Sequence, residues 1–252
     1  MSHLILDIGN SRAKAAIIDD NMIEELYSAD CIQKLELDKL CSRHHIDAAI
    51  ASVVGQQPDF KKILPTDIFN HFHQLSHKSA LPISIDYDTP NTLGMDRIAA
   101  VVGARVACPS YPLLVVDAGT CITVDLLDQD NCYHGGAILP GMKMKLQALH
   151  EYTAALPLVE LSEKELDGSC ITPSLGNSTR NSIVAGVCNA SIYEIQGFIE
   201  DYRRQYPSLK LFLTGGDALF FAKRLFFPNF ATPSLIMFGL DNILNMNLVN
   251  SN

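Results

Sequence analysis

Short apolar runs and segments of helical spacing follow one another along the chain, and the same order occurs twice. Runs of aliphatic and β-branched residues predict buried strands, whereas an apolar stripe of helical period predicts an amphipathic helix. The first half is predicted to contain strands over 3–8, 13–19, 22–27 and 47–54, helices over 32–44 and 91–107, and an extended segment over 79–85. The second half is predicted to contain strands over 113–117, 121–128, 131–138 and 209–214, helices over 141–150, 179–205 and 217–226, and an extended segment over 233–238 before a short C-terminal helix. Strand meanders followed by helices predict α/β halves with mixed sheets.

Both halves open with the same short phrase. An apolar run ends in Asp7-Ile8-Gly9-Asn10-Ser11 in the first half and in Asp117-Ala118-Gly119-Thr120 in the second, and apolar residues resume after each. This pattern predicts a buried strand, a tight turn and a second strand, with glycine allowing the backbone close to a ligand. Two such turns facing one another would clamp a phosphate and a metal ion, which indicates nucleotide chemistry.

Composition narrows the classes of protein. The chain of 252 residues suits one large domain or two similar ones, and its 48% hydrophobic and 19% charged residues are typical of a globular protein. A net charge of −9 argues against nucleic acid or an anionic membrane as a partner. The seven cysteines include no C-x-x-C pair, which argues against a zinc or redox site. The sequence shows no signal peptide, and no apolar run approaches the roughly 20 residues that span a bilayer. We therefore expect a cytoplasmic protein.

The turn of the first half has two interpretations. Residues 7–14 would form a phosphate loop, with Gly9 for close approach, Lys14 or Arg12 as the cation and Asp7 for a metal ion, or else an ordinary hairpin turn. The loop matches neither G-x-x-x-x-G-K-[ST] nor G-x-G-x-x-G. A third glycine turn, Thr214-Gly215-Gly216-Asp217, follows a predicted strand and opens a predicted helix, which suits a nucleotide. Three such turns together favour the functional interpretation.

The three turns resemble the phosphate-1, phosphate-2 and adenosine motifs of the actin and sugar-kinase superfamily. Within it, the chain resembles the type III pantothenate kinases. The further matching segments run in family order and are Tyr87-Asp88-Thr89-Pro90-Asn91-Thr92-Leu93-Gly94-Met95-Asp96-Arg97, 135–141, 177–183 and 233–240.

The resemblance implies a fold, an activity and a site. The fold would be two similar ribonuclease H-like (actin-like) halves, residues 1–112 and 113–252, each with a mixed sheet flanked by helices and with a nucleotide cleft between them. The activity would be ATP-dependent phosphorylation of pantothenate, with Mg²⁺ and a monovalent cation, K⁺ or NH₄⁺, by a homodimer. The residues assigned to ATP are Asp7, Ile8, Gly9, Asn10, Ser11, Arg12, Ala13, Lys14 and Thr120. Those assigned to pantothenate are Tyr87, Gly94, Met95, Asp96, Arg97 and Thr179.

Two more roles follow from the same resemblance. Asp96 would be the general base, and Asp117 would bind the monovalent cation. Asp96 falls in the first turn of a predicted helix, where the helix dipole favours an ionised carboxylate. Arg97 could pair in bidentate fashion with the carboxylate of pantothenate. Thr179 would complete the acceptor pocket, either in its own chain or in that of a partner subunit.

Some features carry less weight, and two other functions stay open. The histidines at 44, 45, 71, 73 and 77 are expected on solvated faces, and Cys121 and Cys188 are expected to be buried core thiols. Asp125 and Asp128 are expected to be polar positions of a strand and its turn. The alternatives are another phosphotransferase or phosphohydrolase of the superfamily and a nucleotide-binding regulatory protein. The segment 87–97 and the intact Asp96 count against them.

Overall fold

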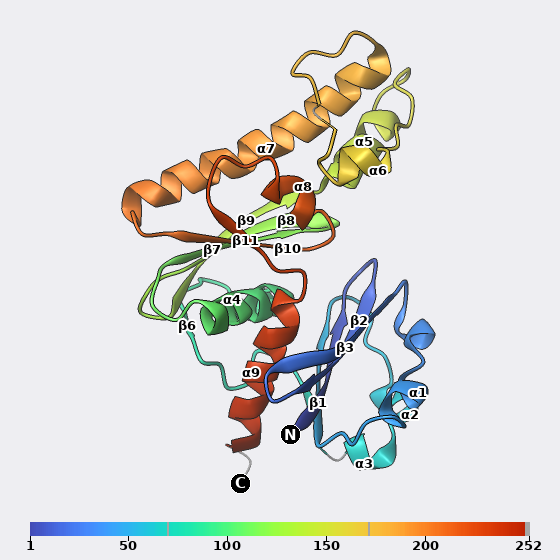
Figure 1. Cartoon of the computed structure of the whole chain (residues 1–252), viewed down its shortest axis with the longest axis vertical. Helices are drawn as coiled ribbons and strands as arrows, with labels where there is room; N and C mark the ends of the chain where they lie inside the picture. Colours follow the sequence, from blue (N-terminus) through green and yellow to red (C-terminus); the bar gives the residue numbers. More distant parts are fainter. Residues whose placement is uncertain (70, 171, 250–252) are drawn as a thin grey trace. The chain divides into compact units, whose positions relative to one another are not determined.

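The chain folds into two compact units in the computed structural model, which describes residues 1–69, 71–170 and 172–249 (Figure 1). Unit 1 comprises residues 1–109 and the C-terminal segment from Ser234, and unit 2 comprises residues 110–233. Within the described residues, no helix is both long and apolar enough to cross a membrane.

Unit 1 is built on a five-stranded sheet with the order β3-β2-β1-β4-β5. Its elements are β1 (Ser2–Ile8), β2 (Ala13–Asp19), β3 (Met22–Ala29), η1 (Ile32–Leu35), α1 (Leu37–Cys41), β4 (Ala48–Val53), α2 (Phe60–Ile63), α3 (Thr66–Phe69), β5 (Phe72–Gln74), β6 (Ser84–Ile85), η2 (Pro90–Thr92), α4 (Met95–Ala107) and α9 (Leu235–Val249). β2 pairs antiparallel with β1 and β3, whereas β4 pairs parallel with β1 and β5.

The sheet of unit 1 is covered on both faces. Leu4 and Leu6 pack with η1, α1 and α2, and helices α4 and α9 contact the sheet at β4. Every residue from His3 to Ile8 is therefore buried, as expected of a strand with a packed layer on each side. This explains why the first strand reads as a continuous apolar run.

Unit 2 repeats the plan. Its elements are β7 (Leu113–Ala118), β8 (Cys121–Leu127), β9 (Cys132–Pro140), α5 (Met142–Glu151), α6 (Glu163–Leu166), α7 (Thr179–Gln205), β10 (Lys210–Thr214), α8 (Ala218–Ala222) and β11 (Asn229–Ala231). The strands lie in the order β11-β10-β7-β8-β9, with β8 antiparallel to β7 and β9 and with β10 parallel to β7 and β11. The five strands of unit 2 thus follow the same order as those of unit 1, with the same pattern of parallel and antiparallel pairs. The prediction of two similar α/β halves with mixed sheets is confirmed.

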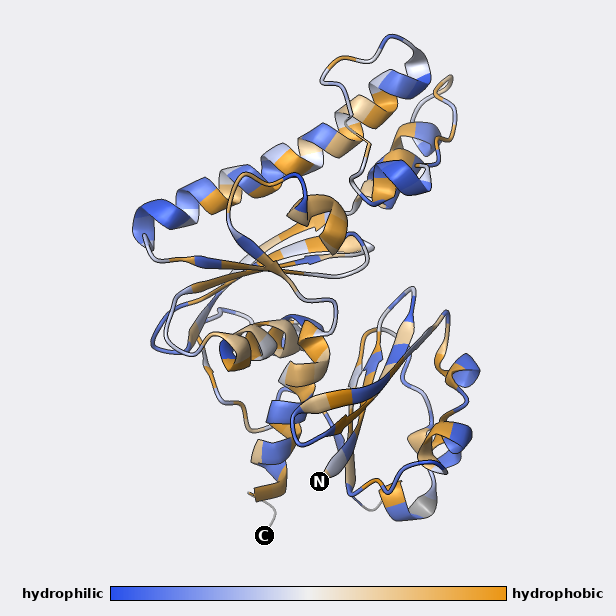
Figure 2. Cartoon of the chain, in the orientation of Figure 1, coloured by the Kyte–Doolittle hydropathy of each residue, from blue (hydrophilic) through white to orange (hydrophobic). Residues whose placement is uncertain are grey.

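Helix α7 shows how the sequence pattern sets packing. Figure 2 shows hydrophilic and hydrophobic residues alternating along it. Its buried residues recur at helical spacing, among them Ile183, Val187, Ile192, Ile195 and Ile199, and they pack on the core of unit 2. The predicted bounds, 179–205, are confirmed.

Three predicted helices differ from the structure in extent. The helix predicted over 217–226 is shorter, since α8 covers Ala218–Ala222. The helix predicted over 32–44 is instead η1 and α1, because Glu36 between them takes the left-handed conformation with φ 48°. The helix predicted from 91 begins at Met95, after the 3₁₀ turn η2.

The C-terminal segment also differs from its prediction. Residues 233–238 were predicted to be extended, but α9 begins at Leu235 and packs along α4. At the crossing, a Cβ on Gly103 or Gly239 would overlap the backbone of the facing helix. The segment from Ser234 therefore belongs to unit 1, although the sequence interpretation placed 113–252 in one half.

A buried hydrogen bond holds α9 to the sheet. His3 Nδ1 of β1 lies 2.6 Å from Asp241 Oδ1 of α9, and both side chains are almost fully buried. The N-terminal strand and the C-terminal helix are thereby joined inside unit 1.

Candidate functional site

The turn between β1 and β2 carries the first group of predicted site residues. It consists of residues 9–12 and is closed by the Gly9 N–H, which donates to the Arg12 carbonyl oxygen at 2.9 Å. Asp7 lies in register with Lys14 on the antiparallel neighbour, so their side chains share one face of the sheet. The turn therefore presents a carboxylate and an ammonium group together.

The carboxyl group of Asp7 has a raised pKa. Burial raises its pKa to about 6, the positive charge of Lys14 acts in the opposite direction, and the negative charge of Asp96 adds to the rise. Asp96, far away in the sequence, is thus within electrostatic reach of Asp7. A buried carboxylate with a raised pKa is a good ligand for a cation, whose charge would relieve the cost of burial.

Asp7→Asn should stabilise the ligand-free protein at pH values above about 4. The folded protein keeps a proton on Asp7 up to about pH 6, whereas the unfolded chain releases it near its ordinary value of 3.8. Wild-type stability should therefore fall relative to the variant as the pH rises from about 4 to 6, by up to about 3 kcal/mol. Urea unfolding of the ligand-free proteins at several pH values checks this.

The control for that series is Asp67→Asn, at an exposed position of α3. It should show no such divergence from the wild type. Equal stability of Asp7→Asn and wild type at pH 4 and pH 7 would show that burial of Asp7 imposes no cost.

Asp96 lies at the start of α4. The helix is preceded by Gly94 in an extended conformation, and Asp96 Oδ1 accepts a hydrogen bond from the Arg97 N–H at 2.9 Å. A Cβ on Gly94 would displace this carboxylate oxygen. Asp96 is partly exposed, so a substrate hydroxyl could reach it.

The other predicted acceptor residues of unit 1 flank Asp96. Tyr87 is half-buried in the connection between β6 and η2, and Met95 is the half-buried first residue of α4. Arg97 is only 7% exposed. Its guanidinium group keeps its charge at this buried position.

The turn between β7 and β8 carries the second group. Asp117 is the second-last residue of β7, and Thr120 lies exposed in the turn. The Gly119 N–H donates to the Cys121 carbonyl oxygen at 2.9 Å. Asp117 and Thr120 therefore stand at the same end of the sheet, as Asp7 and the first turn do in unit 1.

A glycine cradle adjoins Asp117. Gly215 follows β10 with φ +90°, and a Cβ there would overlap both Asp117 Oδ1 and the Ala118 carbonyl oxygen. The Asp217 N–H donates to that Ala118 oxygen at 2.9 Å, and burial raises the pKa of the Asp217 carboxyl group. The second and third glycine turns are thus brought together within unit 2, and they fit a ligand that needs close backbone approach and a carboxylate.

Two more glycines adjoin these turns, and sequence reasoning missed one of them, Gly55. Gly55 follows β4 with φ +91° and a Cβ there would touch Asn10 Oδ1, which makes it the counterpart of Gly215 in unit 1. Gly141 has no room for a side chain against Gly119 and Thr120. The signal for Gly55 was available, because it ends the buried run of β4 as Gly215 ends that of β10.

Thr179 is the first residue of α7 and is exposed. Ser178 precedes it as the N-cap, with its Oγ accepting from the Asn181 N–H at 3.2 Å. The predicted site residues therefore divide between the units. Residues 7–14, Tyr87 and 94–97 belong to unit 1, and Asp117, Thr120 and Thr179 belong to unit 2.

The remaining polar candidates have structural partners. Asp125 Oδ1 accepts from the buried Tyr133 hydroxyl at 2.7 Å, and Asp128 accepts from two backbone N–H groups of its turn. Cys188 is buried as predicted, but the prediction for Cys121 is wrong. Cys121 is the first residue of β8 beside the turn, where its side chain is exposed.

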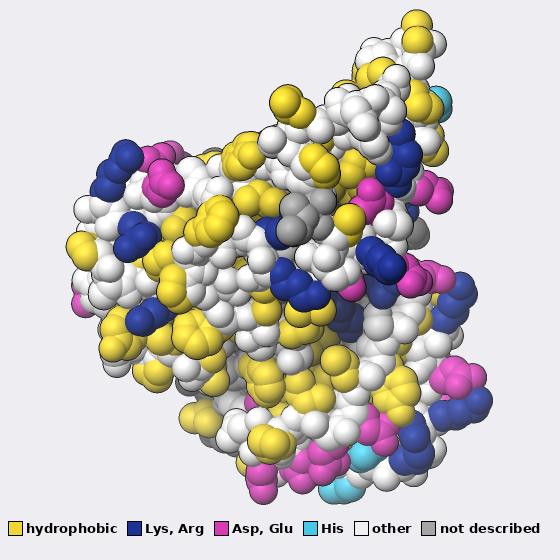
Figure 3. Space-filling model, turned by 45° about the horizontal axis from the view of Figure 1, so that its top comes forward, with side chains coloured by type: hydrophobic (Ala, Val, Ile, Leu, Met, Phe, Trp, Pro, Cys, Tyr) yellow, Lys and Arg dark blue, Asp and Glu magenta, His cyan; other side chains and the backbone are white. Residues whose placement is uncertain are grey.

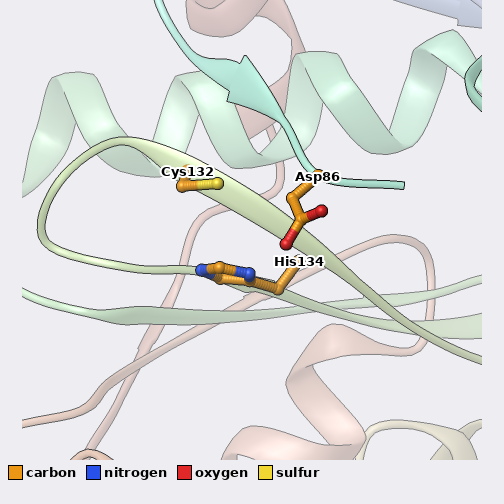
Figure 4. A group of neighbouring side chains, drawn as sticks. All are labelled: Asp86, Cys132 and His134. Carbon is orange, nitrogen blue, oxygen red and sulfur yellow. The ribbon is translucent and has the colours of Figure 1, made fainter. Parts of the chain in front are cut away.

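Figure 4 draws three side chains that offer metal-ligand atoms, Asp86, Cys132 and His134. Cys132 and His134 stand on β9, and His134 Nε2 lies 2.7 Å from Asp128 Oδ2. Asp86 belongs to unit 1 and the other two to unit 2. We assign no metal site to this group.

Comparison with known proteins decides the family. A protein-family model described as type III pantothenate kinase matches residues 3–201. A type III pantothenate kinase of Phocaeicola vulgatus is 41% identical over 251 residues, covering 97% of this chain and 98% of that protein. The chain belongs to the type III pantothenate kinase family. A type III pantothenate kinase of Bacteroides fragilis is 39% identical, again over 97% of this chain and 98% of its own.

A solved structure agrees in fold. The activator of the 2-hydroxyisocaproyl-CoA dehydratase from Clostridium difficile, determined with bound ADPNP, has a TM-score of 0.60. The match covers 100% of this chain and 97% of that one at 12% identity. At this identity the likeness concerns the fold alone. It agrees with the α/β fold of two similar units described above for this member of the type III pantothenate kinase family.

Proposed function

We propose that this protein transfers the γ-phosphoryl group of ATP to the primary hydroxyl of pantothenate. The product is 4′-phosphopantothenate, and the reaction is the first step of coenzyme A biosynthesis. Membership of the type III pantothenate kinase family supports the reaction. The observation that supports this assignment of the site is that the negative charge of Asp96 raises the pKa of the buried Asp7 carboxyl group, as expected if the proposed base lies within electrostatic reach of the proposed phosphate turn.

Asp96 acts as the general base. Phosphoryl transfer depends mainly on positioning and charge neutralisation, and a carboxylate beside the acceptor hydroxyl can take its proton late in the transfer. The hydrogen bond from the Arg97 N–H to Asp96 Oδ1 orients the carboxylate. Asp96 Oδ2 is then the atom that receives the proton.

The acceptor is held by Tyr87, Gly94, Met95 and Arg97, with Thr179 of the same or a partner subunit. Arg97 pairs with the carboxylate of pantothenate, since a guanidinium group matches a carboxylate with two parallel hydrogen bonds. This pairing would fix the far end of the substrate and leave its primary hydroxyl at Asp96. An alcohol without a carboxylate should bind poorly.

ATP is bound by the turn of residues 7–14 and by Thr120. Gly9 and Gly215 allow the backbone close to the nucleotide, and Lys14 supplies a positive charge beside Asp7. A bound Mg²⁺ ion would neutralise charge on the phosphates during transfer. Asp7 fits such an ion, because burial disfavours its unpaired ionised form.

Asp117 binds the monovalent cation, K⁺ or NH₄⁺. Its carboxylate lies against the glycine cradle of Gly215 and the Ala118 carbonyl oxygen, so that oxygen ligands suited to a hard cation lie together. These contacts fall within unit 2.

Asp117→Ala should lose the response to potassium. Removal of the carboxylate leaves carbonyl oxygens alone to attract the cation, so turnover in potassium should fall to the level seen in sodium. Initial rates over a potassium titration measure this. Asp128→Asn is the matched control, since Asp128 is bound within its own turn. An unchanged potassium response in Asp117→Ala would place the cation elsewhere.

The protein forms a homodimer in this proposal. Large apolar side chains of unit 2 are exposed, and Tyr193 of α7 is 60% exposed. Hydrophobic side chains are visible on the surface drawn in Figure 3. The other large apolar side chains of unit 2 that are exposed are Tyr111, Ile138, Met144, Tyr152, Leu158, Leu166, Leu175, Leu219, Phe226 and Phe230. A second copy covering them would remove this apolar surface from water.

Identification of the product tests the reaction. The protein is incubated with ATP, magnesium, potassium and pantothenate, and the product is analysed by mass spectrometry and phosphorus NMR. We expect a phosphomonoester on the primary hydroxyl. Phosphorylation of a different alcohol in preference to pantothenate would favour another phosphotransferase of the superfamily.

A further inference from the structure

The segment that leads into α7 is fastened by side chains of unit 2. The Lys223 ammonium group donates to the Asp167 carbonyl oxygen at 2.7 Å, and the Asn189 amide donates to the Pro173 carbonyl oxygen at 3.1 Å. Arg224 also donates to the carbonyl oxygen of Cys170. These bonds join the connection between α5 and α7 to α7 itself and to the residues that follow α8.

The most specific of these contacts is made by Arg180, the second residue of α7. Its Nη1 donates to Glu165 Oε1 at 3.2 Å and its Nη2 donates to Glu165 Oε2 at 3.0 Å, which is a two-pronged ion pair. Nη2 also donates to the Glu160 carbonyl oxygen at 3.2 Å. One side chain thus ties the first turn of α7 to α6 and to the chain before it.

Glu165 is itself held in place. It closes the capping box of α6, where its Oε2 accepts from the Ser162 N–H at 2.7 Å and from the Ser162 hydroxyl at 2.8 Å. The hydrogen bond from Arg180 lowers the pKa of Glu165 to about 2, with further contributions from Ser162. The Glu165 side chain is only 13% exposed. The anchor for Arg180 is therefore ionised at any working pH and has little freedom to move.

The other side of the same helical turn is also fixed. Gly176 packs against the backbone of Asn181 and Ser182, where a Cβ would overlap them. The Asn181 amide donates to Asn177 Oδ1 at 2.8 Å. In the sequence, Thr179 lies between Asn177 and Arg180, which both make such contacts, and its side chain is exposed.

We infer that Arg180 is a positioning residue for the acceptor substrate, because its two-pronged ion pair with Glu165 fixes the turn that presents the Thr179 hydroxyl. This inference rests on the proposed contact of Thr179 with pantothenate. The ion pair does not touch substrate. Its effect should appear in the affinity for pantothenate and not in the binding of ATP by residues 7–14.

The experiment measures KM for both substrates, kcat and thermal stability in Arg180→Met, Glu165→Gln, Thr179→Val and the two double variants that contain Arg180→Met. Arg180→Met should raise the KM for pantothenate about tenfold, since a displaced binding group loses part of its contact. The KM for ATP should stay within about twofold of wild type. Arg180→Lys keeps the charge without the fork geometry and should restore part of the affinity.

Two double-mutant cycles separate this positioning role from a general effect on stability. Adding Arg180→Met to Thr179→Val, or to Glu165→Gln, should raise the KM for pantothenate little further, because each pair acts through one contact. Arg204→Met is the control, since Arg204 pairs with Asp201 at 3.1 Å near the other end of α7. It should leave both KM values unchanged.

The possible failures are distinguishable. If Thr179→Val leaves the KM for pantothenate unchanged, the proposed contact of Thr179 is wrong and the positioning role is overturned with it. If Thr179→Val raises this KM and Arg180→Met does not, only the positioning role is overturned. Equal rises in both KM values for Arg180→Met, or additive effects of Arg180→Met and Thr179→Val, would also contradict it.

Discussion

Asp96→Asn should lower kcat by about 10²–10⁴-fold, the usual contribution of a general base, while ATP still binds. The amide keeps the size of the side chain and its acceptor oxygen for the Arg97 N–H, but it cannot take the proton of the acceptor hydroxyl. Steady-state rates with pantothenate give kcat, and titration calorimetry with a non-hydrolysable ATP analogue gives the dissociation constant of the nucleotide.

Two further variants sharpen this prediction. Asp96→Glu moves the carboxylate by one methylene and should retain part of the activity, because the base is present but displaced. Asp38→Asn, at an exposed position of α1, is the control for the loss of one negative charge. A kcat for Asp96→Asn within a few-fold of wild type would remove Asp96 as the base.

Gly239→Ala should destabilise unit 1 by about 3 kcal/mol, toward the upper end for overpacking. A Cβ at Gly239 would overlap the Ala99 carbonyl oxygen of α4, and backbone atoms cannot move aside as the end of a side chain can. Helices α4 and α9 would have to separate, and α4 carries Asp96. For a chain of this length the melting temperature should fall by roughly 6–12 °C.

The chain offers a matched control for this change. Gly186 lies inside α7, and a Cβ there would meet nothing within 4 Å in the described residues. Gly186→Ala should therefore stabilise the protein slightly, by up to about 1 kcal/mol, because alanine favours the helix more than glycine does. Equal melting temperatures for Gly239→Ala and Gly186→Ala would show that the crossing of α4 and α9 is not close-packed.

The repeated Asp-x-Gly phrase was the part of the fold that the sequence predicted best. It placed β1 and β2 in one half and β7 and β8 in the other, because an apolar run, a polar turn and a second apolar run have few other structures. Helix α7 was predicted as well, since its apolar stripe is long and regular. Element type is set locally in such segments.

The C-terminal segment shows where local pattern fails. Residues 233–238 are apolar almost throughout, and such a run suits a buried strand or a buried helix equally well. Contacts far away in the sequence decide between them. Gly103 and Gly239 let α9 lie on α4, and Asp241 pairs with His3.

The candidate site was likewise predictable only in part. Motifs indicated which residues carry chemistry, but they did not indicate that Asp96 raises the pKa of Asp7 or that Glu165 anchors Arg180. Both relations join residues from separate elements and depend on packing. Gly55 was missed for a different reason. Its place after an apolar run was visible in the sequence, but its role as the counterpart of Gly215 became clear only from the repeated topology.

Release of ADP by the purified protein tests the central claim most directly. Rates are measured with ATP and magnesium, with and without pantothenate, in potassium and then in sodium. The account predicts ADP release that depends on pantothenate in potassium and falls strongly in sodium. Absence of pantothenate-dependent ADP release in potassium would contradict it.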